Sequence, residues 1–180
     1  MEADYAAIVK GCRRRDRSAQ RALYDALAPM ALGVCMRFAS DRDAAQDLMQ
    51  DGFILVFEKI GSLREPQKLP AWVYHLMLNT CINRYRSSFR MESIDDVSSQ
   101  TLTQELSTAF ADPFANEEIV LAMQKLSPQQ RMVFNLVVVE EFSFEESAKE
   151  LHCTPVTVRS ILSRAKSRLR EILTSEKSAS

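Results

Sequence analysis

Residues 143–169 have the sequence SFEESAKELHCTPVTVRSILSRAKSRL, which contains two closely spaced helix-start signals. It opens with a Ser-x-x-Glu capping box, which predicts a short helix over residues 144–151. A tight turn at residues 152–154 follows, where Thr154 precedes a proline suited to the first turn of a helix. A longer helix should start there and run to about Leu173. Two helices joined by so short a turn predict a helix-turn-helix.

The longer helix has one apolar side and one polar, basic side. Apolar residues at helical spacing form its expected buried stripe, namely Val158, Leu162, Ala165, Leu169 and Ile172. On the other side, residues near the amino end should reach base edges in the major groove, and basic residues farther along should lie near phosphates. The candidates for DNA contact are Thr157, Arg159, Ser160, Ser163, Arg164, Lys166 and Arg168.

A further helix start lies upstream of this motif. Residues 127–130, Ser-Pro-Gln-Gln, offer a cap, a proline at the first helical position and a glutamine that bonds back to the cap. The valine run at residues 137–139 would also suit a buried strand. Capping signals on both sides favour a helix there.

The amino-terminal region also has helical periodicity. Residues 43–60 predict an amphipathic helix whose buried stripe is Ala45, Met49, Phe53, Val56 and Ile60. Its opposite side is an acidic row containing Ile54, which is either a solvated face or a partner surface. A second helix is expected from Pro70 to about Ser87, with a basic end. Residues 19–38 predict two packed helical segments that bend near Pro29.

Charge is distributed in three zones. Residues 1–90 carry a net charge of +4, residues 91–150 carry −9, and residues 151–180 carry +4. Apolar periodicity fails between about residues 87 and 114, which predicts a flexible acidic linker. The predicted architecture is all-α: a domain over residues 1–90, a linker over 91–115, and a domain over 116–180 that contains the helix-turn-helix. Two basic lobes flanking an acidic segment suit a protein that touches DNA twice, although solvated faces would give the same distribution.

Several function classes are disfavoured by composition. Cys12, Cys35, Cys81 and Cys153 form no C-x-x-C pair, so we expect reduced thiols rather than a zinc site or disulfides. No apolar run is long enough for a membrane span and the amino end is not basic, so no membrane insertion and a cytoplasmic location are expected. The two histidines lie in no metal-ligand spacing, and no hydrolase or phosphate-binding motif occurs. We therefore expect neither an enzyme nor a cofactor.

The chain resembles the extracytoplasmic-function subfamily of the sigma-70 class of bacterial RNA polymerase sigma factors. In the first domain, Leu23-Tyr24-Asp25, the run from Asp41 to Asp51, and Trp72-Val73-Tyr74 with Asn79 are similar to region two of that family. In the second, Leu126-Ser127-Pro128-Gln129-Gln130-Arg131, Phe144-Glu145-Glu146-Ser147-Ala148, Thr157-Val158-Arg159-Ser160 and Arg164-Ala165 resemble region four. The resemblance covers nearly the whole chain.

The resemblance implies partners and sites. Core RNA polymerase would bind a face made of Asp47, Gln50, Asp51 and Ile54. The −10 promoter element would be held, as the duplex opens, by Ser62, Arg64, Lys68, Asn79, Asn83, Arg84 and Arg86. The −35 element would be contacted by the helix-turn-helix residues given above. An anti-sigma factor is also implied as a partner, and Trp72 is either a core residue or a base-stacking wedge.

The chain departs from the family pattern at a few positions. Glu141-Phe142 stands where the family often has a glycine before the helix-turn-helix, and Ile161 and Ser163 stand where basic or aromatic residues are frequent. The alternative function is a helix-turn-helix regulator that acts on a polymerase already loaded with a sigma factor. That alternative leaves the first domain unexplained.

Overall fold

The computed structural model describes the backbone of residues 4–86 and 117–179, and the side chains of residues 4–86 and 118–175. Regular structure in these ranges is helical and contains no strand, which confirms the all-α prediction. The chain divides into two compact units, Met1–Cys81 and Ile82–Ser180. The predicted linker and the domain boundaries at residues 90 and 116 lie outside the described residues and stay a prediction.

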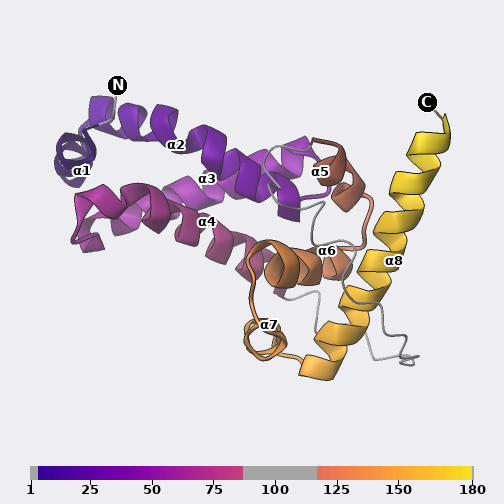
Figure 1. The fold of residues 1–180 in the computed structure, drawn as a ribbon. Coiled ribbons are helices and arrows are strands. Elements are labelled where there is room, and N and C mark those ends of the chain that lie inside the picture. The colour runs from indigo at the N-terminus through magenta and orange to yellow at the C-terminus, as the bar shows by residue number, and fades with distance from the viewer. Residues whose placement is uncertain (1–3, 87–116, 180) are drawn as a thin grey trace. The chain divides into compact units, whose positions relative to one another are not determined.

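The first unit is built from α1 (Tyr5–Arg13), α2 (Arg17–Phe38), α3 (Arg42–Lys59), two short 3-10 turns, η1 (Ile60–Ser62) and η2 (Pro66–Lys68), and α4 (Leu69–Arg86), which continues past the unit boundary. Figure 1 shows α2, α3 and α4 running alongside one another, with α1 folded across the start of α2. The stripe predicted for residues 43–60 is buried at all five positions, so that prediction is confirmed.

Side chains tie α4 to its neighbours at three points. Arg37 on α2 donates to the hydroxyl of Tyr74 at 3.2 Å. The sulfurs of Cys35 and Cys81 lie 3.9 Å apart. The third point is Gly52 on α3, where an added Cβ would overlap the side chain of Met77. A side chain at this position would therefore require the flexible Met77 side chain to move.

Residues 19–38 do not form two segments. They belong to the single helix α2, which passes through Pro29 without interruption, so the expected division was wrong. Pro29 removes one amide donor and is exposed, whereas Leu27 and Ala31 on either side of it are buried. Packing of those neighbours outweighs one missing backbone hydrogen bond.

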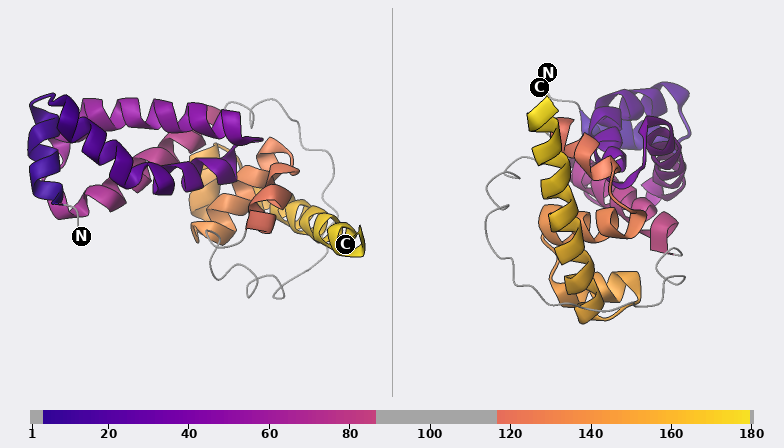
Figure 2. Two further views of the ribbon diagram at one scale, coloured as in Figure 1. Left: turned by 90° about the horizontal axis from the view of Figure 1, so that it is seen from above. Right: turned by 90° about the vertical axis from the view of Figure 1, so that its right-hand side faces the viewer.

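The second unit contains α5 (Glu117–Gln124), α6 (Pro128–Phe134), a π-helical turn η4 (Asn135–Val139), α7 (Phe144–Leu151) and α8 (Pro155–Ala179). α8 packs against α5, α6 and α7 (Figures 1 and 2). The stripe predicted for the long helix is buried throughout. α8 continues beyond the expected end near Leu173, and the valine run is helical rather than a strand.

Local capping chemistry fixes the starts of these helices as predicted. Reciprocal capping boxes join Ser127 to Gln130 and Ser143 to Glu146. The Thr154 hydroxyl accepts the Thr157 amide at 3.2 Å and so caps α8. Each cap satisfies amides that have no partner within their own helix.

Among the residues that the structure describes, three other than glycine adopt left-handed backbone conformations: Arg15 (φ 60°), Glu141 (φ 57°) and His152 (φ 54°). His152 ends α7, where the Cys153 amide donates to the carbonyl of Ala148 at 3.0 Å. This is the Schellman ending, in which glycine is usual. Glu141 stands where the resembled family often has a glycine. Its φ of 57° is a conformation that glycine adopts without strain.

The four cysteines are free thiols. Cys12, Cys35 and Cys81 are buried and Cys153 is half-buried. The hydrogen bond with Cys35 raises the pKa of the Cys81 thiol well above its ordinary value, and burial of the thiol adds to this effect. Within the described ranges, no helix has the length and apolar character needed to cross a membrane.

Candidate nucleic-acid and partner interfaces

The first candidate surface is the outward face of α3. Asp47, Gln50, Asp51 and Ile54 are all exposed, at intervals of three, one and three residues that place them on one side of the helix. Ile54 is 57% exposed, one of the few large apolar side chains so open to solvent among the described residues. The opposite side of α3 is buried in the first unit. Acidic groups around an apolar residue suit a partner with a complementary basic and apolar surface.

The segment between α3 and α4 carries three predicted contacts. Ser62, Arg64 and Lys68 are exposed, and the segment is organised by η1 and η2 rather than being an open loop. The Ser62 hydroxyl donates to the carbonyl of Lys59 at 2.8 Å, and the Lys68 ammonium pairs with Glu65 at 2.9 Å. Ser62 and Lys68 thus already have partners within the chain.

The remaining contacts predicted for the same element are on α4. Asn79 and Asn83 are exposed one helical turn apart, and Arg84 is exposed beside them. Arg86 is half-buried in the last turn. Trp72 is also half-buried, which is compatible with both interpretations of its role, a core residue or a wedge.

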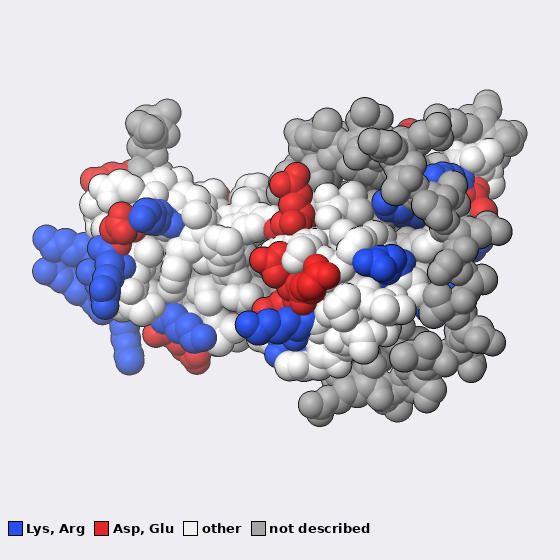
Figure 3. Space-filling view, turned by 60° about the horizontal axis from the view of Figure 1, so that its bottom comes forward, with Lys and Arg blue, Asp and Glu red and all other residues white. Residues whose placement is uncertain are grey.

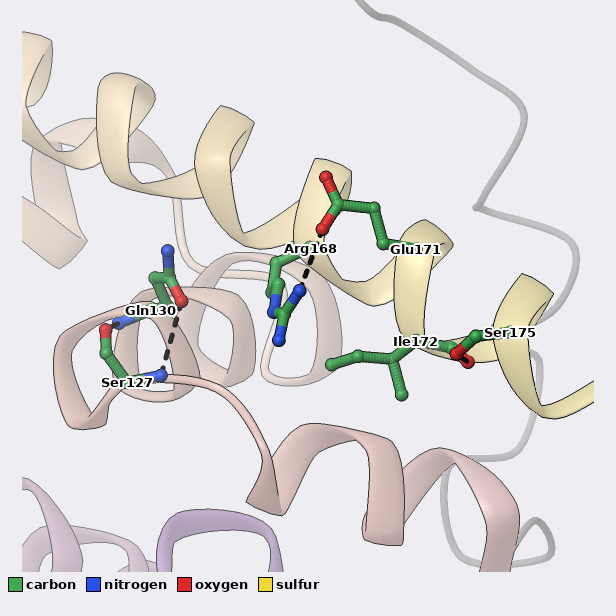
Figure 4. A network of polar contacts seen from close by, with 6 residues as sticks. All are labelled: Ser127, Gln130, Arg168, Glu171, Ile172 and Ser175. Atoms are coloured by element: carbon green, nitrogen blue, oxygen red, sulfur yellow. Dashed lines mark hydrogen bonds and ion pairs between the residues drawn. The ribbon is translucent and has the colours of Figure 1, made fainter.

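The DNA contacts predicted for the helix-turn-helix lie along α8. Arg159 and Arg164 are exposed on α8, and Ser160, Ser163 and Lys166 are half-buried. The Thr157 hydroxyl is within 2.9 Å of the Thr154 hydroxyl at the cap. Arg168 pairs with Glu171 on its own helix at 2.9 Å (Figure 4). Because it is partly neutralised there, Arg168 is a weaker candidate for DNA contact than Arg159 or Arg164.

Two features of this surface had no signal in the sequence. The guanidinium of Arg159 lies over the ring of Phe144, 5.0 Å from its centroid, so α7 holds a side chain that α8 presents. Val156, in the first turn of α8, is 56% exposed and offers an apolar contact beside the arginine. Ile161, one of the departures from the family pattern, is not on the exposed basic side of α8, because it is buried in the core of the unit.

The cap of α7 is also electrostatic. Glu146 accepts hydrogen bonds from the amide and hydroxyl of Ser143 at 2.8 and 2.7 Å. These bonds favour the carboxylate and lower the pKa of Glu146 below its ordinary value. The described residues contain no group of His, Cys, Asp and Glu side chains arranged to hold a metal ion.

Comparison with known proteins accounts for both units. The family model described as "Sigma-70 region 2" matches residues 23–90, and the model described as "Sigma-70, region 4" matches residues 116–169. Together they cover more than half of the chain. The second match contains the helix-turn-helix, and the first contains α3, α4 and the turns between them.

Individual relatives agree with these matches. The chain is 29% identical, over 82% of its length and 81% of the relative's, to the ECF RNA polymerase sigma factor EcfG of Rhodopseudomonas palustris. It is 27% identical to the RNA polymerase sigma-H factor of Pseudomonas aeruginosa, over 88% of each chain. Among solved structures, the sigma factor RpoE of Bartonella quintana, in complex with the anti-sigma factor NepR, is 26% identical with a TM-score of 0.47, over 81% of this chain and 91% of that one.

Proposed function

The chain belongs to the extracytoplasmic-function subfamily of the sigma-70 class of bacterial sigma factors, and from this premise we propose that it binds core RNA polymerase, recognises −35 and −10 promoter elements and promotes DNA melting. The observation that carries the proposal is the occurrence of both family regions, in order, on two helical units. A regulator acting on a polymerase already loaded with a sigma factor would not explain why residues 23–90 match region 2.

Core polymerase would bind the outward face of α3. Asp47, Gln50 and Asp51 would contribute polar and ionic contacts around the side chain of Ile54, which is 57% exposed. An apolar centre within a polar rim is the usual composition of a protein interface. An anti-sigma factor, the other partner implied by the family, would inhibit the protein by covering this or the DNA-binding surface. Because the proposed partners are cytoplasmic, we expect the protein to act in the cytoplasm.

The −10 strand would lie along the turns between α3 and α4 and the exposed side of α4. Arg64 and Arg84 offer exposed guanidinium groups for phosphates, and Asn79 and Asn83 offer amides for base edges. Single-stranded bases have accessible edges and faces, so pocket contacts offset part of the unpairing cost of roughly a few kcal/mol.

The −35 element would be read by α8 in the major groove. Arg159, stacked on Phe144, has the geometry to approach base edges near the amino end of the helix. Arg164 is exposed five residues farther along α8 and would contact a phosphate or a base edge. The stack restricts the Arg159 side chain before binding, which lowers the conformational entropy lost on DNA contact.

The test is reconstituted transcription. The purified chain, added to core polymerase free of other sigma factors, should start RNA from a cognate promoter found by sequencing transcripts after overexpression. Neither component should do so alone. Transcription that requires a polymerase already loaded with another sigma factor would refute the proposal and favour the regulator.

A further inference from the structure

The junction of α1 and α2 concentrates positive charge on a surface that the proposed function does not use. Arg13, Arg14, Arg15 and Arg17, here called the arginine cluster, are all exposed. Figure 3 shows Lys and Arg side chains gathered at one end of the first unit, the end at which α1 lies. Four guanidinium groups within five residues form the densest run of basic residues in the chain.

Nearby acidic groups are occupied elsewhere. The carboxylate of Asp16 accepts hydrogen bonds from the hydroxyl and amide of Ser18, at 2.8 and 2.7 Å, and so caps α2. Asp25 pairs with Arg21 at 2.9 Å. Within the described residues, Arg14, Arg15 and Arg17 form no ion pair. Their charges are therefore available to an external anion.

The arginine cluster adjoins the turns proposed to hold the −10 strand. α1 packs against both η1 and η2. The guanidinium of Arg13 donates a hydrogen bond to the carbonyl of Leu63, fifty residues away in sequence. Arg64 and Lys68 on those turns are exposed as well. One end of the first unit thus carries basic residues from two distant segments of the chain.

Backbone conformation supplies an independent observation. Arg15 follows the end of α1 with φ 60°, and the Asp16 amide donates to the Gly11 carbonyl at 3.1 Å, which completes a Schellman ending. Glycine adopts this conformation without strain, whereas a side chain at Cβ makes it unfavourable. Arginine at this position therefore opposes local stability, which points to a use for its charge.

We infer that the arginine cluster binds the sugar-phosphate backbone of promoter DNA adjacent to the −10 strand, an inference that rests on the proposed function. Arginine forms paired hydrogen bonds with phosphate oxygens. A protein partner would be expected to find an apolar centre, yet the large apolar side chains that are exposed in the described residues, Ile54, Leu121 and Val156, all lie outside the arginine cluster. Backbone contacts there would hold the strand while the adjoining turns and α4 contact its bases.

The test compares charge variants in reconstituted holoenzyme. Binding of a fork-junction promoter DNA is measured over a series of salt concentrations for the wild type and for Arg14→Gln/Arg15→Gly/Arg17→Gln. Arg13 is left intact because it bonds to Leu63. Two single variants complete the set. Arg15→Gly removes one charge and relieves the strained backbone, and Arg42→Gln removes one charge from an exposed position at the start of α3.

The triple variant should bind DNA about 10-fold or more weakly at about 0.1 M salt, with the slope of log K against log salt reduced by about 2, since each single-strand phosphate contact contributes about 0.7. Arg15→Gly should bind DNA more weakly although its melting temperature is no lower than that of the wild type. Arg42→Gln should leave both slope and affinity unchanged.

Other outcomes overturn the inference. An unchanged salt slope in the triple variant, with the wild-type holoenzyme binding its promoter normally, removes the inference and leaves the proposed function intact. Weaker binding of core polymerase in the absence of DNA identifies the arginine cluster as a protein-binding surface instead. Failure of the wild-type holoenzyme to bind any promoter removes the proposed function and the inference with it.

Discussion

At the scale of single residues, the first unit depends on the absence of a side chain at Gly11. A Cβ added there would overlap the Cβ of Ala19, where α1 crosses α2. The Ala19 Cβ cannot move aside by side-chain rotation, so the two helices would have to move apart to accommodate a Cβ at Gly11. This differs from Gly52, where the obstructing atoms belong to the flexible side chain of Met77.

Gly11→Ala should therefore lower the free energy of unfolding by roughly 1–2 kcal/mol, because overpacking exceeds the gain in helix propensity. Gly61→Ala is the matched control, since no atom lies within 4 Å of a Cβ built at Gly61. It should change stability by no more than about 0.5 kcal/mol. Urea denaturation followed by circular dichroism measures both. Equal effects of the two substitutions would disprove the close packing of α1 on α2.

Arg131 shows how one buried charge organises the second unit. Its guanidinium donates to the backbone carbonyls of Met123, Gln124 and Leu126 at 3.0, 3.0 and 2.9 Å. These carbonyls lie at and just after the end of α5, where the regular hydrogen bonding of the helix stops. The Met123 carbonyl also accepts the Leu126 amide at 3.1 Å. Arg131, which the sequence analysis gave only as part of the resemblance to region four, thus joins α6 to α5.

At the scale of the element, the start of α7 depends on a titratable cap. Hydrogen bonds from Ser143 hold the pKa of Glu146 below its ordinary value of 4.5. A carboxyl whose pKa is lower in the folded state stabilises that state fully above its ordinary pKa. The contribution is lost as pH falls through the lower, folded-state value.

Glu146→Gln is thus expected to be less stable than the wild type near pH 7, with the difference shrinking as pH falls from about 5 to below the folded-state pKa. Thermal unfolding of the full chain at a series of pH values measures the difference. Glu145→Gln, the same substitution at an exposed neighbour in the same turn, is the matched control. A constant difference between the wild type and Glu146→Gln across the range would contradict the ionic cap.

At the scale of the whole molecule, polymerase binding and folding should be separable. Asp47 and Asp51 are exposed on α3, while the residues that pack the first unit lie on its other side. Charges of the wrong sign at an interface cost several kcal/mol in binding, whereas exposed substitutions alter folding little.

Asp47→Lys/Asp51→Lys should accordingly weaken binding to core polymerase about 100-fold or more, with an unchanged melting temperature. Asp25→Lys, an exposed acidic residue on α2, is the control and should bind core normally. Core affinity measured by fluorescence anisotropy distinguishes them. Normal binding by the double variant would show that polymerase uses a different face.

The sequence alone determined the all-α class, the buried stripes of α3 and α8 and the starts of α6, α7 and α8. Helical periodicity and capping act between residues at most a few positions apart, so each signal is complete within its own segment. The exposed row on α3 could be predicted for the same reason. Continuity of α2 through Pro29 could not, because buried neighbours rather than local propensity maintain that helix.

Contacts between side chains far apart in the sequence depend on the tertiary structure. Arg159 lies over Phe144, and Arg13 bonds to Leu63, through contacts between separate elements. Burial of Ile161 likewise depends on what α8 packs against. Such contacts are set by how apolar faces pack, and a periodic pattern shows that a face is buried without showing its partner. The sequence therefore predicted which helices carry the proposed DNA and polymerase surfaces, while the packing brought the arginine cluster next to the turns before α4.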